Sequence, residues 1–234
     1  MNQPIGLLEG IATTRAIRRY TDEPVSDADL ATILFAASRA PSGSNRQPFR
    51  FIVLRDGPRA ASARKILAAA AERLWGAKKA ADGYDRGSGA DPDSPKARMA
   101  RTMDHYTAHL AEAPVILLAC LTRHRAPNHF EGASVYPACQ NLLLAARAIG
   151  LGGVLTQIQG LAEADLRAAL EIPENVGLHA TITIGHPAGH HGPVRRRPLC
   201  ELVYEDGWGQ PAPWAVDPEG TRFTAAGPPD GRQI

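Results

Sequence analysis

Residues Arg39 to Asp56 read RAPSGSNRQPFRFIVLRD, a stretch that joins the end of a predicted helix to the start of a predicted strand. Between Pro41 and Pro48 it consists almost entirely of turn formers and short hydrogen-bonding side chains, which predicts a polar loop. From Phe49 onward, aromatic and β-branched residues predict a strand that enters a buried sheet. Binding residues concentrate on loops that a rigid strand holds in place, although a solvated connection can have the same composition.

Helical patterns flank this stretch on both sides. Ser26 followed by Asp29 predicts a capped helix start, and apolar residues then recur at helical spacing as far as Ala37. Pro58 predicts the start of a long, alanine-rich helix that ends near Ala80. Periodicity predicts the remaining helices over residues 5–17, 96–111, 132–150 and 163–170.

Three further segments complete the expected sheet. Residues 115–121, VILLACL, form a continuous apolar run of strand length, which predicts a strand buried on both faces. Gly150 is expected to cap a buried helix in the left-handed conformation, and the glycine-rich turn after it leads into a second β-branched segment. Residues 178–184 predict a strand of strict alternation. Residues 81–95 are mostly chain breakers and small polar residues, which predicts a mobile lid or a disordered insertion.

Composition favours an ordinary globular protein. Hydrophobic residues make up 44% of the 234 positions and charged residues 21%. Because 26 basic residues face 24 acidic ones, no overall basic field points to nucleic acid or to a membrane surface as a partner. Cys120, Cys139 and Cys200 are odd in number and far apart, which favours reduced thiols. The sequence shows neither a signal-peptide pattern nor an apolar run near the roughly 18 residues of a membrane span, so a cytoplasmic protein is expected.

Several kinds of catalytic site are not indicated. The chain contains no G-x-S-x-G elbow, no Walker loop and no complete G-x-G-x-x-G fingerprint. His105 and His109 have the spacing of zinc ligands on a helix, but no third ligand is apparent. His186, His190 and His191 lie in a loop rich in Gly and Pro, where a chance cluster is the simpler interpretation. We therefore expect no metal site.

Arginines near the start of the chain leave two interpretations open. Arg15, Arg18 and Arg19 fall at i, i+3 and i+4, so they share one face if the first helix continues and fan out from its end if it breaks. A solvated basic face is one interpretation. The other is an anion site, because the arginine guanidinium is a planar fork that suits bidentate contacts with phosphate.

Four motifs in order carry a resemblance to a known family: TTRAIRRYTDEPV from residue 13, APSGSNRQPFRFIV from 40, ACQNLLLAARAIGLGG from 138 and GPVRRRPL from 192. They resemble the FMN-dependent nitroreductase family. The resemblance implies an α+β fold with a central, mainly antiparallel sheet flanked by helices, in a homodimer with an extended C-terminal arm. The flavin domain would comprise residues 1–208, with the insertion at 81–95, and the arm residues 209–234.

The resemblance also implies an activity. Members of the family hold FMN in a cleft at the subunit interface and pass reducing equivalents from NADH or NADPH to nitroaromatics, quinones or similar small acceptors in a ping-pong cycle. Reductive dehalogenation, oxygen-dependent flavin chemistry and non-catalytic flavin binding are the alternatives, because function resides in the site and not in the fold. No side chain is expected to act as an essential acid or base, so we name no catalytic residue.

Position by position, the resemblance predicts which residues bind FMN. Arg15 and the arginine triplet 195–197 would hold the phosphate, Arg18 would lie beside the ribityl and pyrimidine side, and the polar loop would reach the flavin of the partner subunit. The turn that includes Gln157 would contribute backbone contacts near the ring. The complete predicted set is Arg15, Ala16, Arg18, Pro41, Ser42, Gly43, Asn45, Gln47, Leu155, Thr156, Arg195 and Arg197.

The chain departs from the family pattern at one of these positions. Many relatives have R-R-S-x-R where this chain has Thr14 to Arg18, TRAIR, so one phosphate-binding arginine and one serine hydroxyl are absent.

Overall fold

The computed structural model describes residues 5–194 and 196–218. These residues fall into two units. One unit comprises residues 16–189 and holds the whole sheet. The other comprises the described residues as far as Arg15 together with those from His190 onward.

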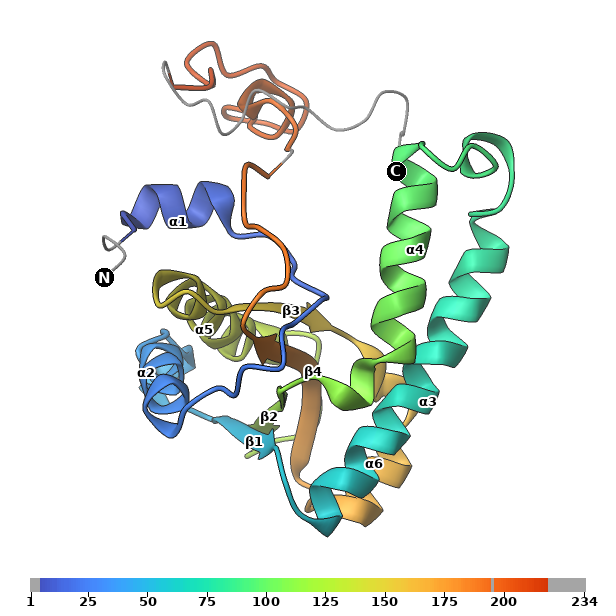
Figure 1. Cartoon of the computed structure of the whole chain (residues 1–234). Helices are drawn as coiled ribbons and strands as arrows, with labels where there is room; N and C mark the ends of the chain where they lie inside the picture. The colour runs from blue at the N-terminus through green and yellow to red at the C-terminus, as the bar shows by residue number, and fades with distance from the viewer. Residues whose placement is uncertain (1–4, 195, 219–234) are drawn as a thin grey trace. The chain divides into compact units, whose positions relative to one another are not determined.

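The unit of residues 16–189 is built on a four-stranded antiparallel sheet with the strand order β1-β2-β4-β3 (Figure 1). The strands are β1 (Phe49–Leu54), β2 (Val115–Thr122), β3 (Gly152–Thr156) and β4 (Val176–Gly185). The central strand β2 is buried from Val115 to Leu121, as its continuous apolar run predicts. A register shift at Ala119 and Cys120 marks an irregularity in its pairing with β4.

Helices cover both faces of this sheet (Figure 1). α2 (Asp27–Ser38) and α5 (Tyr136–Ala148) pack on one face, and α3 (Pro58–Ala81), α4 (Pro95–Ala108) and α6 (Glu163–Leu170) pack on the other. Because successive strand residues point to opposite faces, Leu117 joins the first core while Ile116 and Leu118 join the second. The predicted α+β class with a mainly antiparallel sheet is confirmed.

The predicted helix boundaries that depend on capping are confirmed. Ser26 precedes α2, and its side chain accepts a hydrogen bond from the Asp29 backbone N–H at 3.0 Å. Pro58 is the first residue of α3, where its missing N–H costs no helical hydrogen bond. Gly150 has φ +88°, and the Leu151 N–H donates to the Ala146 carbonyl at 2.8 Å, which closes α5 as a left-handed cap.

The helix expected over residues 132–150 begins later than predicted. Pro137 lies in the first turn of α5, and because proline is tolerated there but not inside a helix, the α-helix cannot extend upstream. A separate 3-10 helix covers residues 131–134 instead. α5 also buries a single face, formed by Ala138, Cys139, Leu142 and Ala146, whereas we expected little polar surface all round.

Of the predicted insertion 81–95, residues 82–94 form turns and a short 3-10 helix over 87–89 between α3 and α4. Tyr84 packs edge-on against Trp75 of α3, with 5.0 Å between ring centroids. The Trp75 indole N–H donates to Asp104 of α4 at 2.7 Å, so the two helices are also joined by a polar contact. A lid role for this segment stays a prediction.

The second unit contains α1 (Leu7–Thr13), which is shorter than the helix predicted over residues 5–17. It ends where Thr14 adopts an extended conformation, and the next backbone N–H, that of Arg15, lies 3.3 Å from Nδ1 of His191. Arg15 therefore shares no helical face with Arg18.

Beyond Arg197 this unit is irregular, with a 3-10 helix over residues 199–201 and turns as far as residue 218. Residues 219–234 of the predicted C-terminal arm lie outside the described part of the chain. Among the described residues, the helices are too short or too polar to cross a membrane.

Candidate active site

The polar loop before β1 is held in a strained conformation. Ser44, Asn45 and Gln47 have φ between +49° and +52°, a region that residues other than glycine seldom adopt. The Gln47 backbone N–H donates to the Ser42 hydroxyl at 2.9 Å, and its side-chain amide donates to the Asn45 side-chain carbonyl at 3.1 Å. Such strain persists where surrounding contacts fix it and is found most often at binding sites. The structure thus brings three of the predicted residues, Ser42, Asn45 and Gln47, together.

Arg18 lies in an extended segment that is anchored to the sheet. The Ile17 backbone N–H donates to the Gly153 carbonyl at 3.0 Å, next to a bridge between Ala16 and Gly153. The Nε atom of Arg18 is buried and has no hydrogen-bond partner in the described part of the chain, although the side chain lines a cavity of about 230 Å³. Since an unsatisfied buried donor costs free energy, an acceptor on a ligand would stabilise this arrangement.

A buried cluster of hydroxyl groups lies beside Arg18. The Tyr20 hydroxyl lies 2.6 Å from the Thr183 hydroxyl and 2.8 Å from the Ile17 carbonyl oxygen, and the Tyr106 hydroxyl lies 3.2 Å from the same threonine. Both tyrosine rings line the cavity that Arg18 lines. Burial raises the pKa of Tyr20 and of Tyr106, so both remain protonated and able to donate.

Sequence reasoning missed this cluster. β4 does alternate as predicted, but its polar residues Thr181 and Thr183 are fully buried instead of facing water. The Thr181 hydroxyl donates to the Gln159 side chain at 3.0 Å, and Thr183 pairs with the tyrosines. The alternating threonines were a signal for buried polar pairing, but their partners come from distant segments that the pattern does not reveal.

The end of β3 approaches the same region. Thr156 is half-buried, donates to the Thr181 carbonyl at 3.2 Å and lies near Tyr106, whose pKa burial raises and Thr156 in part lowers. Leu155 packs against the core on the α2 and α5 side. The Gln157 side-chain amide donates to the Tyr136 hydroxyl at 3.2 Å. Thr156 and Arg18 are therefore both neighbours of Tyr106, as expected if they share a site.

The predicted phosphate-binding arginines belong to the other unit. The segment after His190 pairs with the end of α1, because the Gly192 and Val194 N–H groups donate to the carbonyls of Thr13 and Ala12. The Arg15 backbone N–H lies 3.3 Å from Nδ1 of His191, and the Arg15 side chain is exposed. Residues 12–15 and 191–194 thus lie together within this unit.

Within the triplet, Arg195 lies outside the described residues. Arg197 forms an ion pair with Glu201 at 3.2 Å. Convergence of these cations and Arg18 on one ligand stays a prediction.

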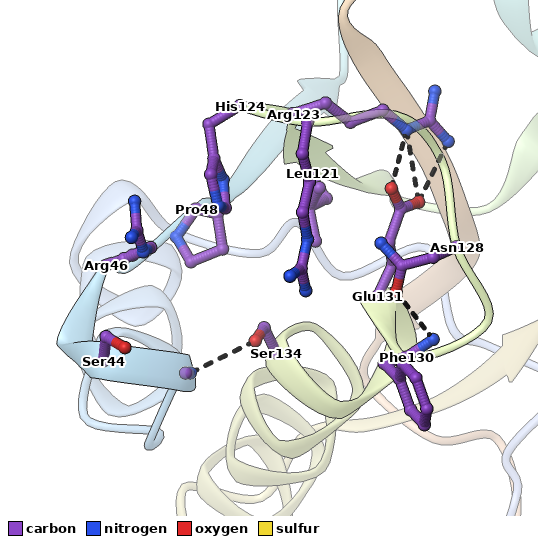
Figure 2. Close-up of a pocket in the computed structure, with 12 residues that line it drawn as sticks. Ser44, Arg46, Pro48, Leu121, Arg123, His124, Asn128, Phe130, Glu131 and Ser134 are labelled. Atoms are coloured by element: carbon purple, nitrogen blue, oxygen red, sulfur yellow. Dashed lines mark hydrogen bonds and ion pairs between the residues drawn. The ribbon is translucent and has the colours of Figure 1, made fainter.

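A second cavity, of about 180 Å³, adjoins the polar loop (Figure 2). Residues 43–48 form one side, and the segment from Leu121 to Ser134 forms the other. Sequence reasoning missed this cavity as well. The sequence RHR at 123–125 was its visible signal, but nothing in the sequence alone places that tripeptide beside the loop.

Comparison with known proteins points to a family. A model of the nitroreductase family matches residues 11–186. A protein from Archaeoglobus fulgidus, provisionally named NADH dehydrogenase/NAD(P)H nitroreductase, is 31% identical over 182 residues, which span 77% of this chain and 84% of the relative. The iodotyrosine deiodinase of Thermotoga neapolitana is 25% identical over 194 residues, 81% of this chain and 91% of the relative.

Among solved structures, the chain is similar to a provisionally named nitroreductase from Desulfovibrio desulfuricans that was crystallised in complex with FMN. The two are 34% identical, with a TM-score of 0.63, and the match covers 88% of this chain and 99% of the other.

Proposed function

Because the chain belongs to the nitroreductase family, we propose that it is an FMN-dependent oxidoreductase that takes reducing equivalents from NADH or NADPH and delivers them to a small aromatic acceptor such as a nitroaromatic or a quinone. The observation that carries the proposal is the buried, unsatisfied Nε atom of Arg18 beside a cavity. Family resemblance assigns this residue to the flavin, and its unpaired Nε atom is able to donate to an acceptor on a ligand. Donor and acceptor would use the same site in turn, in a ping-pong cycle.

The residues present fit FMN. Bound FMN supplies the redox chemistry at its ring system. Arg18 would provide a permanent cation beside the flavin, and the hydroxyls of Tyr20 and Tyr106 are fixed by their contacts with Thr183. The polar loop contributes amide and hydroxyl groups through Asn45 and Ser42. No acid or base from the chain is required.

The proposed enzyme is a homodimer in which the polar loop completes the flavin site of the partner subunit. Two features support this assembly. The loop directs strained, exposed polar residues outward, and Phe35 of α2 is 65% exposed, which is costly for a large aromatic side chain in a monomer. A flavin that binds only the dimer also stabilises the dimer by mass action.

Subunit mixing tests the shared site. Homodimers of Arg15→Ala and of Asn45→Ala/Gln47→Ala are both expected to bind FMN weakly. Once they exchange subunits, each heterodimer has one intact site and one doubly damaged site, so FMN binding returns at one of its two sites. If verified exchange restores no FMN binding, each flavin is held by one subunit.

The activity is tested with FMN-reconstituted protein and four oxidants: a nitroaromatic, a quinone, a halotyrosine and oxygen alone. We expect NAD(P)H oxidation to be fastest with the nitroaromatic or the quinone. Faster turnover with halotyrosine would instead assign reductive dehalogenation, the activity for which the Thermotoga relative is named. Tight FMN binding with negligible turnover in every arm would contradict the enzymatic proposal.

A further inference from the structure

The cavity beside the polar loop is lined by two facing segments (Figure 2). Arg46 and Pro48 lie on one side, and Asn128 and Glu131 lie on the other. The Gly43 N–H donates to the Ser134 hydroxyl at 3.3 Å and links the two segments at one end. The full lining is Gly43, Ser44, Arg46, Pro48, Leu121, Arg123, His124, Arg125, Asn128, Phe130, Glu131 and Ser134.

The lining of this cavity is strongly cationic. It contains three arginines, and Glu131 is the acidic residue among the described lining residues, which leaves a formal charge of +2 before histidine is counted. Arg123 uses its guanidinium on Glu131, with Nε to Oε1 at 2.9 Å and Nη2 to Oε2 at 3.0 Å. Arg46 and Arg125 form no ion pair or side-chain hydrogen bond with the described part of the chain. Both side chains are exposed, so their charges are available to a ligand.

The Glu131 carboxylate is bound to Arg123 and is not available to neutralise Arg46 or Arg125. Its side chain is 9% exposed, and the Arg123 guanidinium holds the pKa of that carboxyl below its usual range. Gly177 leaves room for this guanidinium, since a Cβ there would lie 2.6 Å from Nη2. Burial lowers the pKa of His179, whose ring lies 3.5 Å from Glu131, so the histidine is neutral at pH 7. The ion pair of Arg123 and Glu131 therefore forms one wall of the cavity.

We propose that this cavity binds a diphosphate group. Arginine guanidiniums match phosphate oxygens with planar forks, and the hydroxyls of Ser44 and Ser134 add neutral hydrogen-bonding groups. A volume of about 180 Å³ is several times the roughly 30 Å³ of one water and suits a diphosphate better than a complete dinucleotide. Phe130, 66% exposed in this lining, offers an apolar ring face for the sugar or base that would extend outward.

The diphosphate is that of the nicotinamide dinucleotide donor. This assignment rests on the proposed function, because Gly43 and Ser44 line the cavity and belong to the loop that we assign to the flavin. A donor anchored here by its diphosphate would have its nicotinamide end close to that loop. The diphosphate site itself does not depend on the proposed function, because it is inferred from the charge and the geometry of the cavity lining.

The test compares two double variants of the FMN-reconstituted protein. Arg46→Gln/Arg125→Gln removes the two uncommitted cations, while the control Arg59→Gln/Lys65→Gln removes two charges from the exposed face of α3. Binding of inorganic pyrophosphate and of ADP-ribose is measured by calorimetry. We expect both to bind at least about tenfold more weakly to the cavity variant and unchanged to the control. Thermal unfolding verifies that each variant folds, and the single variant Arg125→Gln replaces the double one if it does not.

Steady-state kinetics then assign the ligand. Because Arg46 belongs to the loop assigned to the flavin, the kinetics use the single variant Arg125→Gln. Its donor KM should rise about tenfold, while the acceptor KM and the affinity for FMN stay at their wild-type values. Loss of FMN would show that the cavity holds the flavin phosphate, and an unchanged donor KM would remove the donor from it; either result overturns the assignment. Absence of pyrophosphate and ADP-ribose binding to the wild type would overturn the diphosphate site itself. Because inorganic pyrophosphate and ADP-ribose lack a redox centre, their binding can be measured even if the protein proves to have no NAD(P)H oxidation activity.

Discussion

Gly153→Ala should destabilise the protein because no space exists for a methyl group where β3 meets β4. A Cβ at this position would lie 2.5 Å from the Thr183 carbonyl oxygen and 2.5 Å from Cδ1 of Ile184. The isoleucine methyl can move, but the carbonyl belongs to the paired strand, so the strands must separate. Overpacking of this kind costs about 1–3 kcal/mol. For a domain of this size, that corresponds to a fall in Tm of about 2–12 °C.

The same change should weaken FMN binding, since the Gly153 carbonyl accepts the hydrogen bond that anchors Ile17 directly before Arg18. Gly160→Ala is the matched control, because a Cβ there meets no atom within 4 Å. Thermal and urea unfolding, with FMN affinity from fluorescence titration, provide the two readouts. The reasoning is refuted if Gly153→Ala is as stable as Gly160→Ala and binds FMN equally well.

Three further predictions concern the predicted phosphate site, the ion pair and the insertion. Arg15→Ala should weaken FMN binding by about 1.5–3 kcal/mol, the range for hydrogen bonds to a charged partner, and wild-type affinity in a fluorescence titration would remove Arg15 from the site. Glu131→Gln should lower the free energy of unfolding by about 1–3 kcal/mol at pH 7. Because the folded pKa of Glu131 lies below its ordinary value of 4.5, the stability advantage of the wild type is complete above pH 4.5 and shrinks as the pH falls through the folded pKa. Urea unfolding of both proteins from pH 7 to 3 measures this advantage, and a difference that does not change with pH would contradict the prediction. Replacing residues 82–93 by a short Gly-Ser linker should change the acceptor KM more than FMN affinity, and steady-state kinetics showing the reverse would exclude a role for this segment at the acceptor site.

The sequence predicted the elements whose signals are local. The Ser26 cap, Pro58 and Gly150 act through their own backbone and nearest neighbours, so the helix ends they mark agree with the structure. The run from Val115 to Leu121 identified the central strand because a strand covered by helices on both faces has no polar alternation. The polar loop was singled out by composition.

The contacts that build the candidate site were not predictable in this way. Tyr20 and Tyr106 are 86 positions apart and meet only at Thr183. The first helix was predicted too long because the backbone beyond Thr14 bonds to distant segments. The Arg15 N–H lies 3.3 Å from Nδ1 of His191, and the Ile17 N–H donates to the Gly153 carbonyl; apolar periodicity does not register either partner. The cationic cavity depends on the 123–125 tripeptide lying opposite residue 46, which only the folded chain shows.

The central claim, that this chain binds FMN and accepts reducing equivalents from a nicotinamide donor, is tested most directly by an anaerobic titration. FMN-loaded protein is titrated with NADH and separately with NADPH while the visible absorption of the flavin is recorded. We predict that one stoichiometric equivalent of at least one donor bleaches the flavin, and that a nitroaromatic or quinone added afterwards restores the oxidised spectrum. If the spectrum stays oxidised with an excess of both donors, while dithionite still bleaches the bound flavin, the proposed function is contradicted.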